Sequence, residues 1–191
     1  MEAKLYIDRH TDLVERCKLG DRKAQYELYR QYAKAMYNVC MRILNHAGEA
    51  EDVLQEAFLD AFNNIGSFRQ QSTFGAWLKQ IVVNRSINHL RSRWGRSSGL
   101  QMVDIDEYRL GEDEGYDIAD DEPYDEEGIK MEVERVRQAV QALPEGYRIV
   151  LTLYLFEGYD HEEIGQTLGI SESTSRSQYL RAKKRLLEIL K

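Results

Sequence analysis

The stretch DHEEIGQTLGISESTSRSQYLRAKKRL, residues 160–186, carries the signals of two helices joined by a tight turn. Asp160 can cap the first helix, and Glu163 can complete a reciprocal capping arrangement with it. Gly169 can take the left-handed backbone conformation that ends this helix, because glycine has no Cβ to clash. Ser171 can then cap the second helix. This order of caps and helix breaker predicts a helix-turn-helix.

The second helix of this pair is amphipathic. Its four- and three-residue steps predict a buried stripe formed by Ser175, Tyr179, Ala182 and Leu186. The hydroxyl of Ser175 needs a hydrogen-bond partner in that stripe, such as the backbone carbonyl one turn back. The other side chains of the helix are expected to point outward or to flank the stripe.

The outward face combines short polar, aliphatic and cationic side chains near the start of the helix. These residues are Ser173, Arg176, Ser177, Leu180 and Arg181. Arg can pair with both acceptors of a guanine edge, and an exposed Leu can contact the methyl group of thymine. Lys183 and Lys184 follow, and cations there suit DNA phosphates. The composition of this face therefore favours a helix that recognises double-stranded DNA. The alternative is an amphipathic terminal helix whose outer face is only solvated.

The net charge of −7 does not argue against a nucleic-acid partner, because the acidic residues are concentrated in one segment. Residues 104–127 contain 13 of the 33 Asp and Glu residues and one of the 26 Lys and Arg residues. The rest of the chain holds 20 acidic and 25 basic residues and is cationic. Since DNA binding depends on local clusters of Lys and Arg, the overall acidic charge is compatible with a DNA partner.

Apolar periodicity predicts helices on both sides of this acidic segment. Before it, we expect three, which begin after Asp21, near Gly48 and at Phe74, the last one ending near Arg93. After it, we expect four, over residues 129–142, 144–156, 161–168 and 172–190. No segment shows a convincing strand alternation. We therefore predict an all-α fold with two small helical domains, residues 1–94 and 129–191, joined by a flexible acidic linker over residues 95–128.

Composition excludes several classes of protein. The two cysteines, Cys17 and Cys40, allow neither a disulfide framework nor a four-cysteine zinc site and suit a reducing cytoplasm. There is no apolar core of a signal peptide, and no stretch approaches the roughly 20 apolar residues of a membrane span. HEEIG at 161–165 lacks the second His of a zinc-protease helix, and residues 113–127 lack the glycine register of a calcium loop. We expect no metal, cofactor, membrane insertion or enzymatic activity.

Two long segments together resemble one family. The sequence ALPEGYRIVLTLYLFEGYDHEEIGQTLGISESTSRSQYLRAKKRL, residues 142–186, resembles region 4 of bacterial sigma factors. The sequence EAEDVLQEAFLDAFNNIGSFRQQSTFGAWLKQIVVNRSINHLRSR, residues 49–93, is similar to sigma region 2. The two segments occur in this order in a short chain without a region 3 domain. In this respect the chain resembles the extracytoplasmic-function (ECF) group of the sigma-70 family. The resemblance implies a dissociable transcription initiation factor that directs core RNA polymerase to promoters and helps to open the DNA.

In region 2, the resemblance implies three roles. Asp52, Gln55 and Glu56 would dock on the clamp helices of the largest polymerase subunit; helical spacing independently puts them on one face, with ordinary surface charge as the alternative. The loop at residues 67–74 and the helix after it would capture a flipped base of the non-template strand. The candidates for that capture are Phe68, Arg69, Ser72 and Asn84. The candidates for phosphate contacts are Arg85, Arg91, Arg93 and Arg96.

In region 4, the resemblance assigns the upstream promoter element to the outward face described above and adds the polymerase flap as a partner. It also implies that the protein binds promoter DNA in both its double-stranded and its single-stranded form. A further implied partner is an anti-sigma factor, which can hold the protein at the inner membrane face. The acidic linker would thread the RNA exit channel, although a solubilising tether explains its composition almost as well. The main alternative is a helix-turn-helix regulator that does not bind core polymerase stably. A more remote alternative is an enzyme with an all-helical fold.

Overall fold

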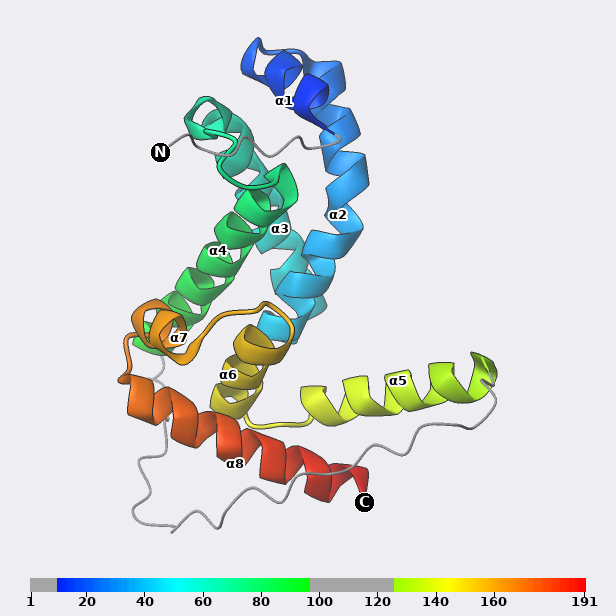
Figure 1. The fold of residues 1–191 in the computed structure, drawn as a ribbon, viewed down its shortest axis with the longest axis vertical. Coiled ribbons are helices and arrows are strands. Elements are labelled where there is room, and N and C mark those ends of the chain that lie inside the picture. Colours follow the sequence, from blue (N-terminus) through cyan, green and yellow to red (C-terminus); the bar gives the residue numbers. More distant parts are fainter. Residues whose placement is uncertain (1–9, 97–125) are drawn as a thin grey trace.

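The computed structural model describes residues 10–96 and 126–191. Within these residues the chain forms helices and no β-strand, which confirms the predicted all-α fold (Figure 1). In chain order, the elements are α1 (Thr11–Lys18), α2 (Arg22–Leu44), α3 (Ala47–Asn63), the 3-10 helix η1 (Ile65–Ser67), α4 (Phe74–Arg96), α5 (Glu126–Gln141), α6 (Glu145–Leu155), α7 (His161–Leu168) and α8 (Glu172–Leu190).

The first half is a bundle of α2, α3 and α4, with α1 packed against the start of α2 (Figure 1). Helix α2 begins where the sequence predicts, because the Asp21 carboxylate accepts hydrogen bonds from the backbone N–H groups of Lys23 and Ala24. Cys17 and Cys40 are free thiols in the core of this bundle, and burial raises the pKa of each to about 11. Such thiols stay protonated at neutral pH, so both cysteines act as small apolar core residues.

The second half contains the predicted helix-turn-helix, formed by α7 and α8. The Asp160 carboxylate accepts a hydrogen bond from the Glu163 N–H at 2.8 Å, and the Glu163 carboxylate accepts one from the Asp160 N–H at 2.9 Å. Gly169 ends α7 with a φ of 73°, and Ser171 caps α8. A Cβ atom at Gly165 would lie 2.9 Å from a backbone carbonyl oxygen of the turn, so the close crossing requires glycine there.

The structure differs from the predicted linker at both of its ends. Helix α4 continues to Arg96, beyond the expected end at Arg93, and α5 begins at Glu126 instead of Ile129. Glu has a good intrinsic helix propensity, so the two glutamates before Gly128 can extend this helix towards its N-terminus. The rest of the predicted linker, residues 97–125, lies outside the described residues.

The two halves are in contact with each other. Helix α6 lies against the end of α2, and α7 lies against the later part of α4 (Figure 1). One apolar core includes buried residues of both halves, among them Ile149, Val150, Leu153 and Ile164 from the second half. A smaller core joins α5, α6 and α8 through Val140, Leu143, Leu151 and Ala182.

Candidate polymerase and nucleic-acid interface

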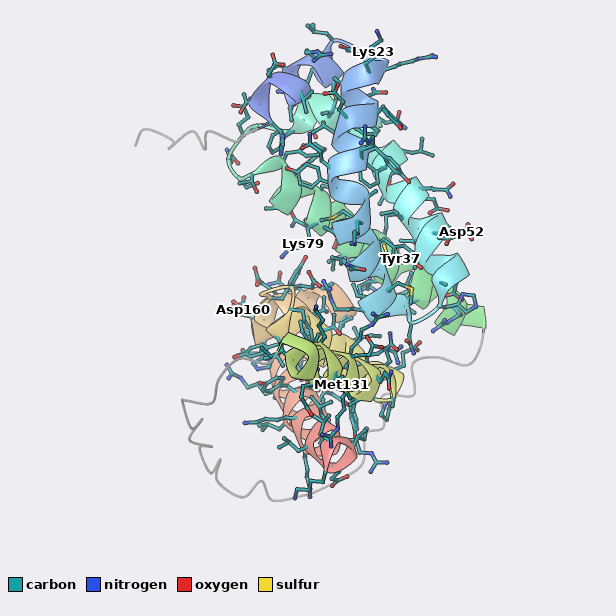
Figure 2. The ribbon with its side chains drawn as sticks, turned by 90° about the vertical axis from the view of Figure 1, so that its right-hand side faces the viewer. Lys23, Tyr37, Asp52, Lys79, Met131 and Asp160 are labelled. Carbon is teal, nitrogen blue, oxygen red and sulfur yellow. The ribbon has the colours of Figure 1, made fainter. Side chains whose placement is uncertain are left out.

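Helix α3 presents the predicted docking residues on one exposed face. Asp52, Gln55 and Glu56 are all exposed, and Figure 2 shows Asp52 on the outer side of α3, away from the second half. Leu59 lies one turn further along the same face and is 62% exposed. The sequence analysis missed Leu59, although its spacing of three and four residues from Glu56 and Gln55 could have revealed it. The face thus combines acidic, amide and apolar groups.

The loop before α4 exposes polar groups above an aromatic base. Phe68 is 4% exposed, and its ring lies 5.9 Å from that of Phe74 and 5.3 Å from that of Trp77 between centroids. The Phe68 ring therefore supports the loop from inside and is not on its surface. Arg69 is exposed, and Ser72 is half-buried. Of the predicted loop candidates, these two can reach a ligand directly.

Asn84 is not near this loop. It lies about 15 Å further along α4 than Phe74, at about 1.5 Å per residue. There it lines a polar cleft of about 370 Å³ between α4 and α7. The other lining residues are Ile87, Asn88, Arg91, Gln166 and Thr167. The structure therefore separates Asn84 from Phe68, Arg69 and Ser72.

Arg85 is held by acidic groups of α3. Its guanidinium donates a hydrogen bond to the Asp60 carboxylate, which lowers the pKa of that carboxyl group. It also lies 3.5 Å from the Glu56 carboxylate on the docking face. Arg96 is the last residue of α4, and its side chain lies outside the described part of the structure. Arg85 thus links α4 to α3 in the free protein.

Arg91 and Arg93, near the end of α4, contact the second half of the chain. Arg91 donates a hydrogen bond of 2.6 Å from Nη2 to the backbone carbonyl of Thr167, at the end of α7. Arg93 donates to the carboxylates of Glu49, at 3.1 Å, and of Glu145. With Arg85, three of the four predicted phosphate-binding arginines therefore have partners in the structure.

Helix α8 presents the predicted DNA-reading residues outside its buried stripe. Ser173, Arg176 and Lys184 are exposed, and the partly exposed members are Ser177, Leu180, Arg181 and Lys183. Arg176 donates hydrogen bonds of 3.1 and 2.5 Å to the Glu172 carboxylate, one turn back. In the stripe, Ser175 and Ala182 are fully buried as predicted, and Gln178 is buried beside them.

The partner of the Ser175 hydroxyl differs from the one expected. It forms a 3.0 Å hydrogen bond with Nδ1 of His161 at the start of α7, instead of with a carbonyl one turn back. The imidazole of His161 stacks on Tyr154, with ring centroids 4.6 Å apart, and meets the edge of Tyr179. Since His161 belongs to the first helix of the motif and Ser175 to the second, this bond fixes how α7 and α8 cross.

We expect the second half to lose stability in mild acid through His161. Burial, and then the positive charge of Arg176, lowers the pKa of His161 below its ordinary value of 6.5. The unfolded chain then binds this proton more readily than the folded chain, so the contribution is complete above about pH 6.5 and decreases as the pH falls below it. Melting temperatures of the wild type and of His161→Gln between pH 7.5 and 5 test this. The wild type should show the steeper decrease, and parallel curves would exclude His161 as the cause.

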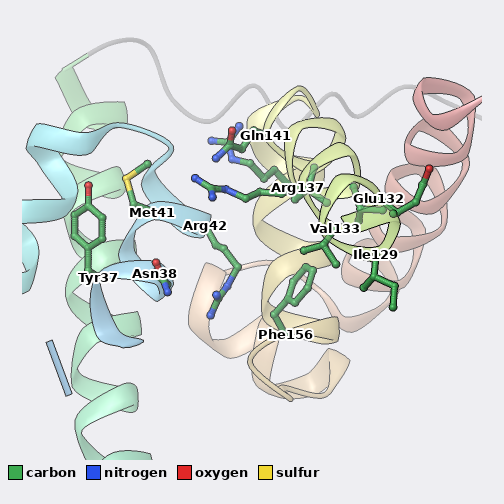
Figure 3. A pocket seen from close by; sticks show the side chains of 14 residues that line it. Tyr37, Asn38, Met41, Arg42, Ile129, Glu132, Val133, Arg137, Gln141 and Phe156 are labelled. Atoms are coloured by element: carbon green, nitrogen blue, oxygen red, sulfur yellow. The ribbon is translucent and has the colours of Figure 1, made fainter. Parts of the chain in front are cut away.

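A groove of about 960 Å³ runs between the two halves (Figure 3). Tyr37 and Met41 of α2 form one wall, and Val133 of α5 and Phe156 after α6 form the other. Because each half supplies one wall, the groove exists only while the halves are in contact. None of the helices within the described ranges combines the length and apolar character needed to cross a membrane.

A helix-turn-helix with Arg and Lys side chains outside its buried stripe, on an all-α chain, is the arrangement of a class of DNA-binding proteins. Two family models match this chain: sigma-70 region 2 over residues 28–96, and sigma-70 region 4 over residues 133–186. The chain is 34% identical over 178 residues to the RNA polymerase sigma-H factor of Pseudomonas aeruginosa, which covers 92% of this chain and 91% of that protein. It is 32% identical over 177 residues to the ECF RNA polymerase sigma-E factor of Escherichia coli K12. This match covers 90% of this chain and 88% of that protein.

The chain therefore belongs to the ECF group of the sigma-70 family of RNA polymerase sigma factors, as its two motifs predicted. Solved structures with a similar fold include CnrH in complex with the cytosolic domain of CnrY, with a TM-score of 0.50 and 20% identity over 93% of this chain and 94% of that one. Another is the sigma factor RpoE in complex with the anti-sigma factor NepR from Bartonella quintana, with a TM-score of 0.52 and 20% identity over 86% and 95%. At this identity the likeness concerns the fold.

Proposed function

We propose that this sigma factor is a dissociable subunit that docks on core polymerase through the face of α3. Asp52, Gln55 and Glu56 would contact the clamp helices of the largest subunit, and we add Leu59 to this docking face. The observation that carries the proposal is that four exposed side chains share one side of one helix. Protein interfaces commonly combine a polar rim with apolar side chains at the centre, and this face offers both.

Residues 129–191 are proposed to read the upstream promoter element, and residues 1–94 the downstream one. The start of α8 would enter the major groove with Ser173, Arg176, Ser177, Leu180 and Arg181 towards the base edges. Lys183 and Lys184 would hold phosphates, which position the helix without selecting a sequence. Support comes from the fact that all seven residues lie outside the buried stripe of α8.

The loop at residues 67–74 is proposed to capture an unpaired base during strand opening. Extracting a base costs a few kcal/mol of stacking, which a preformed pocket can offset. Arg69 and Ser72 would contact the base, and the Phe68 ring would keep the loop in place. Arg85, Arg91, Arg93 and Arg96 would follow the DNA backbone along α4.

Asn84 is proposed to contact the unpaired strand separately, from the cleft between α4 and α7 and not from the loop. On this proposal, Asn84→Ala is expected to slow open-complex formation about fivefold, the equivalent of one hydrogen bond of about 1 kcal/mol. Affinity for core polymerase should not change, because Asn84 lies on α4 and the docking face lies on α3. Permanganate footprinting of unpaired thymines over time measures opening, and a binding titration measures affinity. The control is Asn38→Ala, an exposed Asn on α2, outside both α3 and α4. A parallel loss of both quantities would exclude a specific role in opening.

Promoter-specific transcription in vitro tests the proposed function as a whole. The purified protein is added to sigma-free core polymerase from the bacterium that encodes it, with a library of genomic DNA fragments as template. We expect discrete start sites that require the protein. Without start sites, and without binding to core polymerase, a helix-turn-helix regulator would be the better explanation.

We further propose an anti-sigma factor as a regulatory partner. Support comes from membership of the family and from solved relatives that are complexes of this kind, such as RpoE with NepR. The protein would work in the cytoplasm, held at times at the inner membrane face by that partner. It would have no enzymatic activity of its own, because the polymerase performs the chemistry. Residues 95–128 would connect the two DNA-reading parts.

A further inference from the structure

The groove between the two halves, which we call the interdomain groove, has an apolar interior. Tyr37 and Met41 of α2 line one side, and Phe156, which is 48% exposed, lines the other. A stripe of α5 at four- and three-residue steps adds Ile129, Val133, Val136 and Val140. Val133 is 62% exposed in spite of its place in this stripe. Exposed apolar side chains that gather in a concave surface mark a place where a ligand can exclude water.

The charged side chains of the interdomain groove are mostly cationic. Its lining includes three arginines and one acid, namely Arg42, Arg137, Arg148 and Glu132. Figure 3 shows Arg137 extending from α5 towards α2, into the space between the walls, and Glu132 pointing away from that space. Arg42 is already paired with the buried Glu157 carboxylate, to which it donates hydrogen bonds of 2.5 and 3.1 Å. The other two arginines favour a ligand with negative charge.

Arg148 is a buried cation with an incomplete set of partners. Its side chain is 7% exposed, and its Nη2 lies 3.9 Å from the carboxylate of Glu145, which Arg93 also contacts. Its Nη1 donates a 3.2 Å hydrogen bond to the Leu143 carbonyl, whereas its Nε has no acceptor within residues 10–96 and 126–191. Burial lowers the pKa of Arg148, so its surroundings compensate the charge only in part. An anion in the groove would supply the missing compensation.

The size of the groove favours a small molecule over a segment of another protein. Its volume of about 960 Å³ lies within the range of about 300–1,000 Å³ that is usual for small-molecule sites. An α-helix with its side chains is about 10–12 Å wide, so about two turns of a helix would take up a similar volume. Two turns contain far fewer residues than the roughly 20–30 that each side of a standard protein interface contributes.

We propose that the interdomain groove is a binding site for a long-chain carboxylate, with the acyl chain on the apolar wall and the carboxylate on Arg148. A guanidinium binds a carboxylate through two parallel hydrogen bonds, which an alcohol cannot accept in the same way. Arg137 adds attraction, because its exposed pair with Glu134, at 3.4 Å, costs little to exchange. The inference goes beyond the proposed function and does not depend on it.

Titration calorimetry of the full chain with decanoate tests this site. We expect saturable binding of one decanoate per chain. Hexanoate, which is four CH₂ groups shorter, should bind at least about tenfold more weakly, because each buried CH₂ contributes up to about fourfold in affinity. Decanol, which has the same chain without the charge, should also bind at least about tenfold more weakly.

A charge on the apolar wall tests where the acyl chain lies. Val133→Asp should weaken decanoate binding at least about tenfold, because the new carboxylate repels the ligand and removes apolar contact. The matched control is Met131→Asp, which makes the same change at a residue of α5 that is 74% exposed and outside the groove lining. Its affinity should stay within about twofold of the wild type. Both side chains are exposed, so both variants should fold.

A second pair of variants tests the charge. Arg148 is buried and its replacement can disturb folding, so the exposed Arg137 is changed instead. Arg137→Gln should weaken decanoate binding about threefold and leave decanol binding unchanged, whereas Lys130→Gln, an exposed cation of α5 outside the groove lining, should change neither. Absence of saturable decanoate binding, or equal losses in Val133→Asp and Met131→Asp, would overturn the proposal. Tight binding of an acidic amphipathic peptide without binding of decanoate would also overturn it, in favour of a protein partner.

Discussion

The double variant Asp52→Lys/Leu59→Ser is expected to bind core polymerase about 100-fold more weakly than the wild type, a loss of about 2.8 kcal/mol. Asp52 would face a positive clamp surface, so the new Lys turns an attraction into a repulsion. Leu59 would bury its side chain on docking, and full burial of a Leu is worth about 1.5–3 kcal/mol. Both side chains are exposed in the free protein, so folding should be unaffected. A fluorescence titration with core polymerase measures the affinity.

The matched control is Glu27→Lys/Leu19→Ser. It makes the same charge reversal and the same Leu→Ser change in the same half of the protein, at an exposed acid on α2 and at a Leu that is 88% exposed. Its affinity should stay within about threefold of the wild type, since surface charges away from an interface contribute little. Equal losses in the two double variants would show that net charge matters and the docking face does not.

Arg176→Ala is expected to lower affinity for the upstream element about 30-fold, the equivalent of about 2 kcal/mol, and to relax the preference at one base pair. A bidentate contact between Arg and guanine contributes about 1–3 kcal/mol of discrimination. In the free protein Arg176 is paired with Glu172, but the pair is exposed and thus costs little to exchange for a base. Selection from a randomised upstream element by the polymerase complex measures the preference.

Two further variants separate base reading from charge. Arg185→Ala removes an exposed cation from the same helix and should weaken binding to all sequences alike. Arg176→Lys keeps the charge but loses the planar fork, so the base preference should relax as it does in Arg176→Ala. An unchanged preference in Arg176→Ala would remove this residue from base readout.

The sequence predicted the helix-turn-helix because its signals are local. Asp160 and Glu163 are three residues apart and bond to each other's backbone, and Gly169 ends the helix with its own φ angle. The observed helices α7 and α8 have the predicted bounds for the same reason. The common face of Asp52, Gln55 and Glu56 likewise follows from helical spacing within a single element.

The sequence could not predict where the loop candidates lie relative to one another. Phe68 resembles a base-stacking residue in sequence, but the fold buries its ring against Phe74 and Trp77. Asn84 resembles a member of the same site, but the rise of α4 carries it away from the loop to the cleft with α7. Helical periodicity reports which face a residue lies on, and it does not report which distant element covers that face.

By itself, the sequence determined the helices other than α1 and η1, the caps of α2, α7 and α8, the outward faces of α3 and α8, and the family to which those motifs belong. All of these depend on residues within a few turns of one another. The tertiary structure alone decided that His161 satisfies the Ser175 hydroxyl and that Glu157 binds Arg42, 115 residues earlier in the chain. The physical reason is that such partners are chosen by how helices pack, and packing depends on the summed fit of many side chains that no local pattern encodes.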